Sequence, residues 1–213
     1  MTERELCYEI LYSTHIEGEL SHVALKKALD RCDREGKSLN KGFVAGLVNG
    51  VNERYLTLMY LIEKQSGRPT GKIKAPIRII LAMGIYQGYY MSVPKSAACN
   101  ESVKLAVKRG FSGLKGFVNG VLRGMFRSIE NIDKFLDEKL ANESISKKYS
   151  VKYSCPEWLV VHYFNTIGKE QTVRLLEASL EKAEMSGAFL YFSYSLLDMV
   201  VICIELGIST NVS

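Results

Sequence analysis

Of the residues in this sequence, cysteine can take part in the most kinds of chemistry, because a thiolate can attack an electrophile, bind a metal ion or form a disulfide. The chain has five cysteines, widely spaced and without a Cys-x-x-Cys pair: Cys7, Cys32, Cys99, Cys155 and Cys203. This odd, scattered set predicts neither a disulfide framework nor a zinc site, and it favours a reducing compartment. The histidines share no spacing that would build a metal site or a catalytic relay. They are His15, His22 and His162.

A second set with chemical potential is a polar and basic row that recurs every four residues: Lys115, Asn119, Arg123 and Arg127. Residues four apart share one face of a helix, so the row predicts a track of contacts for nucleic-acid phosphates. Two further basic clusters are candidates for the same role: Lys104, Lys108 and Arg109, and Lys72, Lys74 and Arg78. The alternative for each residue is an ordinary solvated helix face, and Asn119 could instead bond a neighbouring helix.

The segment from Gly67 to Lys72 has some features of a phosphate-binding loop. It has three residues between its glycines instead of four, and Ile73 stands where a serine or threonine must bind magnesium. We interpret it as a basic turn.

The charge of the chain is unevenly distributed. The 28 basic and 23 acidic residues give a formal net charge of +5, but residues 183–213 hold three acidic residues and no lysine or arginine. The first 182 residues therefore carry 28 basic against 20 acidic side chains, or +8. This balance is typical of a module that meets a polyanion. Hydrophobic residues at 47% and charged residues at 24% exclude disordered and collagen-like classes.

Signals for export and for membrane insertion are missing from the sequence. The first five residues are partly acidic, where a signal peptide needs a basic and then an apolar stretch. Arg78 and Gln87 interrupt the segment between Pro76 and Gly88, which we interpret as a core helix and not a membrane span. We expect a cytoplasmic protein that does not contact a membrane.

The basic clusters must be carried by helices, because apolar residues recur at helical spacing and no strand pattern competes before residue 188. The sequence predicts about nine helices with short connections, as in an antiparallel bundle. Thr2 and Glu5 form a capping box for the first helix, Ser21 can cap the second, Ser38 opens the third, and residues 142–153 are a linker. Gly84 and Gly88 permit close helix contact. We expect these residues on the buried face of the sixth helix: Cys99, Val103, Ala106 and Val107.

Three segments are similar to the signature segments of the NusB fold, in the same order and spacing: Ile79–Gln87, Asn100–Ala106 and Phe117–Leu122. The resemblance covers roughly residues 2–140. It implies an all-α fold, a NusB-like antiparallel helical bundle of two packed subdomains, and it implies RNA binding.

The NusB fold occurs as a free transcription antitermination factor and as the N-terminal domain of the RsmB/Sun family of 16S ribosomal RNA cytosine-5 methyltransferases. Lys152–Leu159 resembles the Tyr-Ser-x-Pro-x-Trp-Leu linker of that family, and Leu175–Ala178 continues the match. A free NusB would end soon after Leu122. The chain is therefore identified as a member of the methyltransferase family. This implies RNA, expected to be 16S rRNA, as its partner, with a ribosomal protein or a separate catalytic domain as further candidates.

The resemblance ends after about Lys182. The chemistry of the family requires a cysteine thiolate that adds to C6 of cytosine, a second cysteine for product release and a glycine-rich turn for AdoMet. The sequence has no Pro-Cys pair, Thr-Cys-Ser segment or such a turn, and Cys155-Pro156 has the reverse order. We therefore expect no catalysis by this chain and no cofactor, with AdoMet needed only by the catalytic domain that is missing here.

Residues 183–213 form an atypical apolar tail. Ala188–Ile204 is too short and too polar for a spanning helix, and Phe189–Tyr194 and Met199–Ile204 could equally be strands. Our hypothesis is a gene truncated or frameshifted after residue 182, which the DNA downstream of the Lys182 codon would test.

The predicted organisation is therefore an RNA-binding helical domain over residues 1–140, linker helices over 141–182 and the tail over 183–213. The leading function is that of an rRNA docking module, with a role in rRNA processing. Two alternatives stay open: a NusB-type antitermination factor, which would regulate transcription, and a scaffold that binds only protein. Failure to bind RNA at low salt would favour the scaffold.

Overall fold

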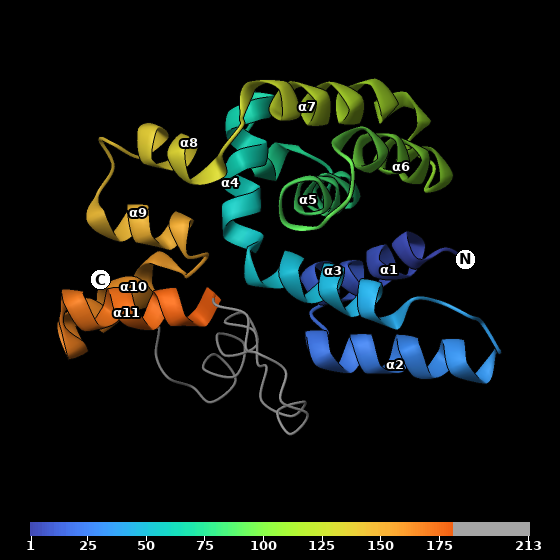
Figure 1. Cartoon of the computed structure of the whole chain (residues 1–213), viewed down its shortest axis with the longest axis horizontal. Coiled ribbons are helices and arrows are strands. Elements are labelled where there is room, and N and C mark those ends of the chain that lie inside the picture. The colour runs from blue at the N-terminus through green and yellow to red at the C-terminus, as the bar shows by residue number, and fades with distance from the viewer. Residues whose placement is uncertain (181–213) are drawn as a thin grey trace. The chain divides into compact units, whose positions relative to one another are not determined.

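The computed structural model describes residues 1–180 of the 213-residue chain (Figure 1). Over these residues it contains eleven α-helices, two 3-10 turns and no strand, which confirms the predicted all-α class. The chain divides into two compact units, Met1–Glu130 and Asn131–Ser213, and the second is described as far as residue 180. No described helix is long and apolar enough to cross a membrane.

Three helices form one layer of the first unit: α1 (Glu3–Ile16), α2 (Ser21–Arg34) and α3 (Lys41–Glu53). The predicted capping box is confirmed, because the Thr2 hydroxyl accepts from the Glu5 amide and the Glu5 carboxylate accepts from the Thr2 amide, both at 3.3 Å.

One predicted helix cap and one predicted helix start were wrong. Ser21 is the first residue of α2 and not its cap, a position that Leu20 takes without a side-chain bond. Helix α3 begins at Lys41 and not near Ser38, because the Asn40 side-chain oxygen accepts from the Phe43 amide at 2.9 Å and caps the helix.

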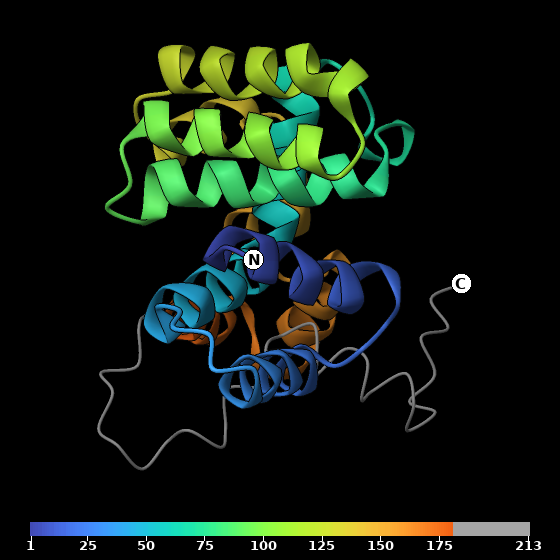
Figure 2. The same ribbon diagram turned by 90° about the vertical axis from the view of Figure 1, so that its right-hand side faces the viewer.

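The second layer of this unit consists of four helices and two short turns: α4 (Tyr55–Ser66), η1 (Thr70–Lys72), α5 (Ala75–Tyr90), α6 (Lys95–Lys108), η2 (Ser112–Leu114) and α7 (Lys115–Ser128). Figure 2 shows α5, α6 and α7 stacked in rows, with α1, α2 and α3 beneath them. Helix α5 is the central element, since it contacts α4, α6 and α7 as well as α1 and α3. Most of its residues are buried, from Ile77 to Gln87.

The glycines of α5 allow this stacking. A Cβ at Gly84 would lie 2.6 Å from the Ser102 hydroxyl of α6 and 2.9 Å from a methyl group of Leu122 on α7. A Cβ at Gly88 would lie 2.5 Å from the ring of Phe126. The close helix contact predicted from these two glycines is therefore confirmed.

One face of α6 was predicted wrongly. Val107 is 43% exposed, whereas Ser102 and Leu105 are buried. Burial of Ser102 is tolerated because its hydroxyl donates to the Ala98 carbonyl at 2.8 Å. The buried arc of α6 is therefore rotated away from Val107, toward Ser102 and Leu105, of which the serine is not favoured by hydropathy.

The second unit is described through four helices: α8 (Ile132–Lys139), α9 (Ile145–Lys152), α10 (Glu157–Ile167) and α11 (Lys169–Leu180). Their shared core contains Tyr153, Cys155, Val160 and Leu176. The predicted linker over residues 142–153 is corrected by α9, which Ser144 caps by accepting from the Lys147 amide at 3.1 Å.

The predicted domain limits are not tested by these units. The contacts separate the units after Glu130, ten residues before the limit predicted at residue 140. The tail over residues 183–213, with its two candidate strands, lies outside the described residues.

Candidate nucleic-acid interface

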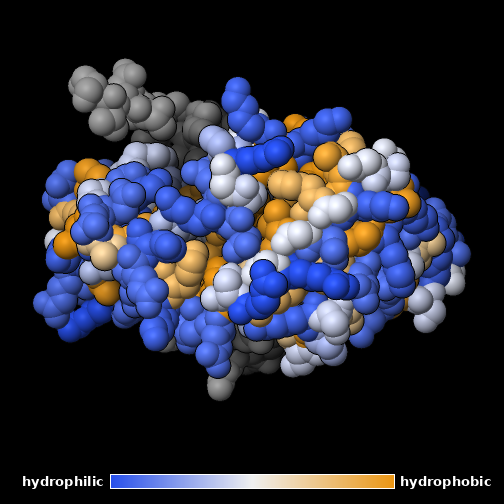
Figure 3. All heavy atoms as spheres, turned by 90° about the horizontal axis from the view of Figure 1, so that it is seen from above, coloured by the Kyte–Doolittle hydropathy of each residue, from blue (hydrophilic) through white to orange (hydrophobic). Residues whose placement is uncertain are grey.

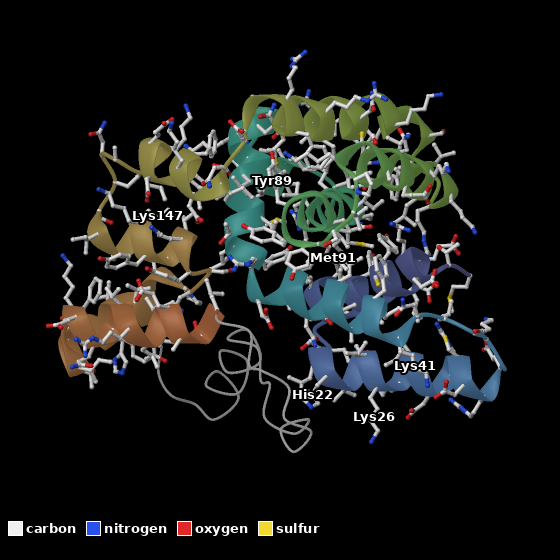
Figure 4. All side chains as sticks on the ribbon, in the orientation of Figure 1. His22, Lys26, Lys41, Tyr89, Met91 and Lys147 are labelled. Carbon is white, nitrogen blue, oxygen red and sulfur yellow. The ribbon has the colours of Figure 1, made fainter. Side chains whose placement is uncertain are left out.

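Helix α7 is amphipathic, and its buried side fixes the direction of the predicted basic row. Val118, Val121, Leu122 and Met125 are buried against the other helices of the unit. At 100° per residue, Arg123 and Arg127 project from the opposite side, which faces solvent. The tyrosine Tyr89, labelled in Figure 4, supports the far end of the helix, because its hydroxyl lies 3.0 Å from the Met125 carbonyl and 2.7 Å from the Ile129 carbonyl.

Three members of the row have free cationic groups within residues 1–180. Lys115, Arg123 and Arg127 are exposed and make no hydrogen bond or ion pair there. Figure 3 views the molecule from the α7 side and shows strongly hydrophilic side chains around an apolar patch. With a rise of about 1.5 Å per residue, Arg123 and Arg127 are separated by about 6 Å along the axis and Lys115 precedes Arg123 by about 12 Å.

The fourth member, Asn119, has a different environment. It is half-buried, and its side-chain oxygen accepts from the Cys99 thiol of α6 at 3.3 Å. Asn119 therefore bonds a neighbouring helix, which is the alternative that the sequence left open for it.

The surface between the cations of α7 is open. Gly116 and Gly120 are exposed, and a Cβ on either would meet no atom within 4 Å. The outward face of α7 thus presents cations beside bare helix backbone, an arrangement that an extended polyanion can follow at close range.

The cluster of Lys72, Lys74 and Arg78 is split by the structure. Arg78 donates to the carbonyls of Thr70 at 2.9 Å and Ile73 at 3.4 Å, so it holds the connection between α4 and α5. Lys72 is exposed on η1. The ammonium of Lys74 lies 5.7 Å from the ring centroid of Phe111, in the turn between α6 and α7.

Arg68 joins this region, although it was not among the predicted contacts. Its guanidinium lies 5.5 Å from the ring centroid of Phe117 on α7. The structure therefore brings the α4–α5 connection next to α7 and next to the turn that precedes it, and adds Arg68 to the basic surface. The only sequence signal was the basic composition of the turn that follows Gly67.

The cluster at the end of α6 points toward acidic partners. Lys104 pairs with Glu101 at 2.8 Å, and Lys108 pairs with Glu5 of α1 at 2.5 Å. Arg109 pairs with Glu9 of α1 at 3.0 Å. Unlike the cations of α7, each of these three side chains already has a carboxylate partner inside the protein.

No metal or nucleophilic site emerges among residues 1–180. No group of three or more histidine, cysteine or acidic side chains there has the geometry to hold a metal ion. The four described cysteines are all buried, and burial raises the pKa of Cys7 and of Cys155 to about 12. The candidate site in the described residues is therefore the surface formed by exposed lysine and arginine side chains.

Comparison with known families shows where such a fold is found. The family model described as NusB family matches residues 1–127, more than half of the chain. The chain belongs to the NusB family. All ten side chains predicted to contact RNA lie within this NusB-type domain.

Curated relatives extend the similarity past the NusB domain. A probable ribosomal RNA small subunit methyltransferase B from Synechocystis is 36% identical over 176 residues, which cover 82% of this chain and 38% of the relative. The protein of the same name from Bacillus subtilis is 28% identical over 197 residues, covering 85% and 42%. Ribosomal RNA small subunit methyltransferase B from Salmonella typhi is 31% identical over 163 residues, covering 76% and 35%. The chain thus spans about two fifths of the length of these relatives.

Proposed function

We propose that this chain is an RNA-binding module that docks ribosomal RNA, with 16S rRNA as its target, through the outward face of α7. The observation that carries the proposal is the set of three exposed cations, Lys115, Arg123 and Arg127, without partners in the described part of a NusB-family domain. Cations free of intramolecular carboxylates can neutralise phosphates without first breaking an ion pair.

Kinship with methyltransferases supports rRNA as the target. The similarity to the Synechocystis relative covers 82% of 213 residues, or about 175, and so extends beyond the 127 residues of the NusB match. A free antitermination factor would account for the NusB domain, but it would leave this additional similarity without an explanation. The proposal therefore assigns the chain to ribosomal RNA and not to transcript regulation.

The experiment is a titration of the purified chain with single-stranded 16S rRNA fragments at a series of salt concentrations. If phosphates are neutralised, log affinity falls linearly with log salt, with a slope of about −0.7 per contacted phosphate. With three cations in contact, we expect a slope of about −2. Absence of binding at low salt would refute the proposal and favour the protein-binding scaffold.

A further inference from the structure

Arg109 directly follows α6 as its C-cap residue, and its side chain is held by α1. Its Nη2 atom donates to the Glu5 carbonyl at 3.2 Å and to the Glu9 carboxylate at 3.0 Å. Its guanidinium carbon lies 4.6 Å from the ring centroid of Tyr8, and the side chain is only 27% exposed. Helix α1 therefore contacts the guanidinium of Arg109 in two ways: the Tyr8 ring lies against its planar face, and two oxygen atoms accept from its Nη2 atom. Arg109 and Glu9 are 100 residues apart in the sequence.

The turn that leads to α7 begins at the next residue. Gly110 has a φ of +85°, a left-handed conformation that favours glycine. The Gly110 amide donates to the Val107 carbonyl at 3.0 Å and the Phe111 amide to the Ala106 carbonyl at 2.9 Å. The chain then passes through η2 to Lys115, the first cation of α7. The contacts of Arg109 with α1 therefore hold the start of the turn that leads to the cations of α7.

We propose that Arg109 is a positioning residue of the RNA-binding face and not a phosphate contact. This inference rests on the proposed function. To reach a phosphate, the guanidinium would have to leave both oxygen acceptors and the Tyr8 ring, and Glu9 would keep only Arg31 of α2, at 2.8 Å. The bonds of Arg109 instead hold the end of α6 on α1 while Lys115, Arg123 and Arg127 meet the RNA.

The first test variant is Arg109→Lys, which keeps the charge but loses the planar guanidinium that stacks on Tyr8 and whose Nη2 atom bonds two acceptors. Its affinity for a single-stranded RNA oligonucleotide should fall about three- to tenfold, the effect of losing one or two hydrogen bonds. Arg109→Gln, which removes the charge, should keep the salt slope of the parent, because Arg109 contacts no phosphate. Arg123→Ala, in contrast, should flatten the slope by about 0.7.

The second variant, Glu9→Gln, distinguishes a positioning role of Arg109 from a general effect of charge, because the two predict opposite changes in RNA affinity. Removing a negative charge should tighten RNA binding if only overall electrostatics acts. The positioning role predicts weaker binding, because the ion pair that anchors Arg109 is lost. Arg31→Lys is the matched control: it perturbs the same Glu9 carboxylate from α2, and it should leave RNA affinity unchanged.

Circular dichroism and thermal unfolding verify that each variant is folded, and Glu9→Gln decides the matter if Arg109→Lys does not fold. The inference is overturned if Arg109→Lys binds as tightly as the parent, if Arg109→Gln has a flatter salt slope, or if Glu9→Gln binds more tightly. A parent chain that binds no RNA removes the proposed function and this inference together, so the two failures are distinguishable.

Discussion

Glu5 links the start of α1 to the end of α6. Its carboxylate accepts from the Thr2 amide and from the Lys108 ammonium, at 3.3 Å and 2.5 Å. The bond to Lys108 is the main cause that lowers the pKa of Glu5 below its ordinary value. A carboxyl group with a lower pKa in the folded state contributes stability above its unfolded pKa, and this contribution is lost as the pH falls through the folded pKa.

Replacing Lys108 should therefore have a pH-dependent effect on stability. Lys108→Met should lower the free energy of unfolding at pH 7 by at most about 1 kcal/mol, because the lysine is 63% exposed and solvent screens the pair. The difference from the parent should shrink between about pH 5 and pH 3, as Glu5 takes up a proton. Urea denaturation at several pH values measures this, with Lys95→Met as the control for losing a lysine of α6, because Lys95 lies over the rings of Tyr89 and Phe126 and has no carboxylate partner among the described residues. If the free energies of unfolding of the parent and Lys108→Met differed by as much at pH 3 as at pH 7, the Glu5–Lys108 pair could not be the cause of the difference.

Residue spacing could predict which face of α7 meets solvent, but not which cations are already paired. Arg123 and Arg127 lie opposite the buried side of the helix, a local property that a period of 3.6 residues reveals. The partners of Lys108 and Arg109 lie 103 and 100 residues away in α1, and no local pattern encodes such a separation. Asn119 is similar, since its partner Cys99 lies on another helix.

At the scale of elements, predictions succeeded where one residue type fixes local geometry. The Thr2–Glu5 box and the α5 glycines meet that condition. Helix α9 was missed because its buried residues, Ser150 and Val151, give no apolar period, although Ser144 offered a capping signal.

The close packing of α5 predicts the effect of a single methyl group. Gly84→Ala should destabilise the fold by about 1 to 3 kcal/mol, because the new Cβ would overlap Ser102 and Leu122 in a packed core. Gly46→Ala is the matched control in α3, where a Cβ meets nothing within 4 Å, and it should stabilise by up to about 1 kcal/mol. Thermal unfolding of both variants measures the effects. Equal melting temperatures for the two would contradict the described α5–α6–α7 packing.

At the scale of the whole molecule, the chain combines a NusB-family domain with similarity to methyltransferases of which it spans about two fifths. Its described cysteines are buried, and a thiol whose pKa is about 12, as for Cys7, is almost entirely protonated at neutral pH. The thiolate and not the thiol is the nucleophile in cytosine-5 methyl transfer.

The sequence also contains no Pro-Cys pair and no Thr-Cys-Ser segment. From these missing segments we expect that this polypeptide alone does not transfer methyl groups from AdoMet to 16S rRNA. AdoMet should also leave its melting temperature unchanged, since a ligand stabilises a fold only by binding the native state. Incorporation of a labelled methyl group into the RNA and thermal unfolding with AdoMet measure the two effects. Detectable cytosine-5 methylation, or a melting temperature that rises with AdoMet, would contradict this expectation.

The most direct test of the RNA-binding face compares two double variants with the same loss of charge. Arg123→Ala with Arg127→Ala removes two cations of α7, and Lys26→Ala with Arg34→Ala removes two exposed cations of α2 (Figure 4 labels Lys26). The α7 variant should bind all single-stranded RNA sequences more weakly and flatten the salt slope by about 1 to 2 units, whereas the α2 variant should bind like the parent. Equal behaviour of the two variants would show that charge alone is responsible and would contradict the assignment of the interface to α7.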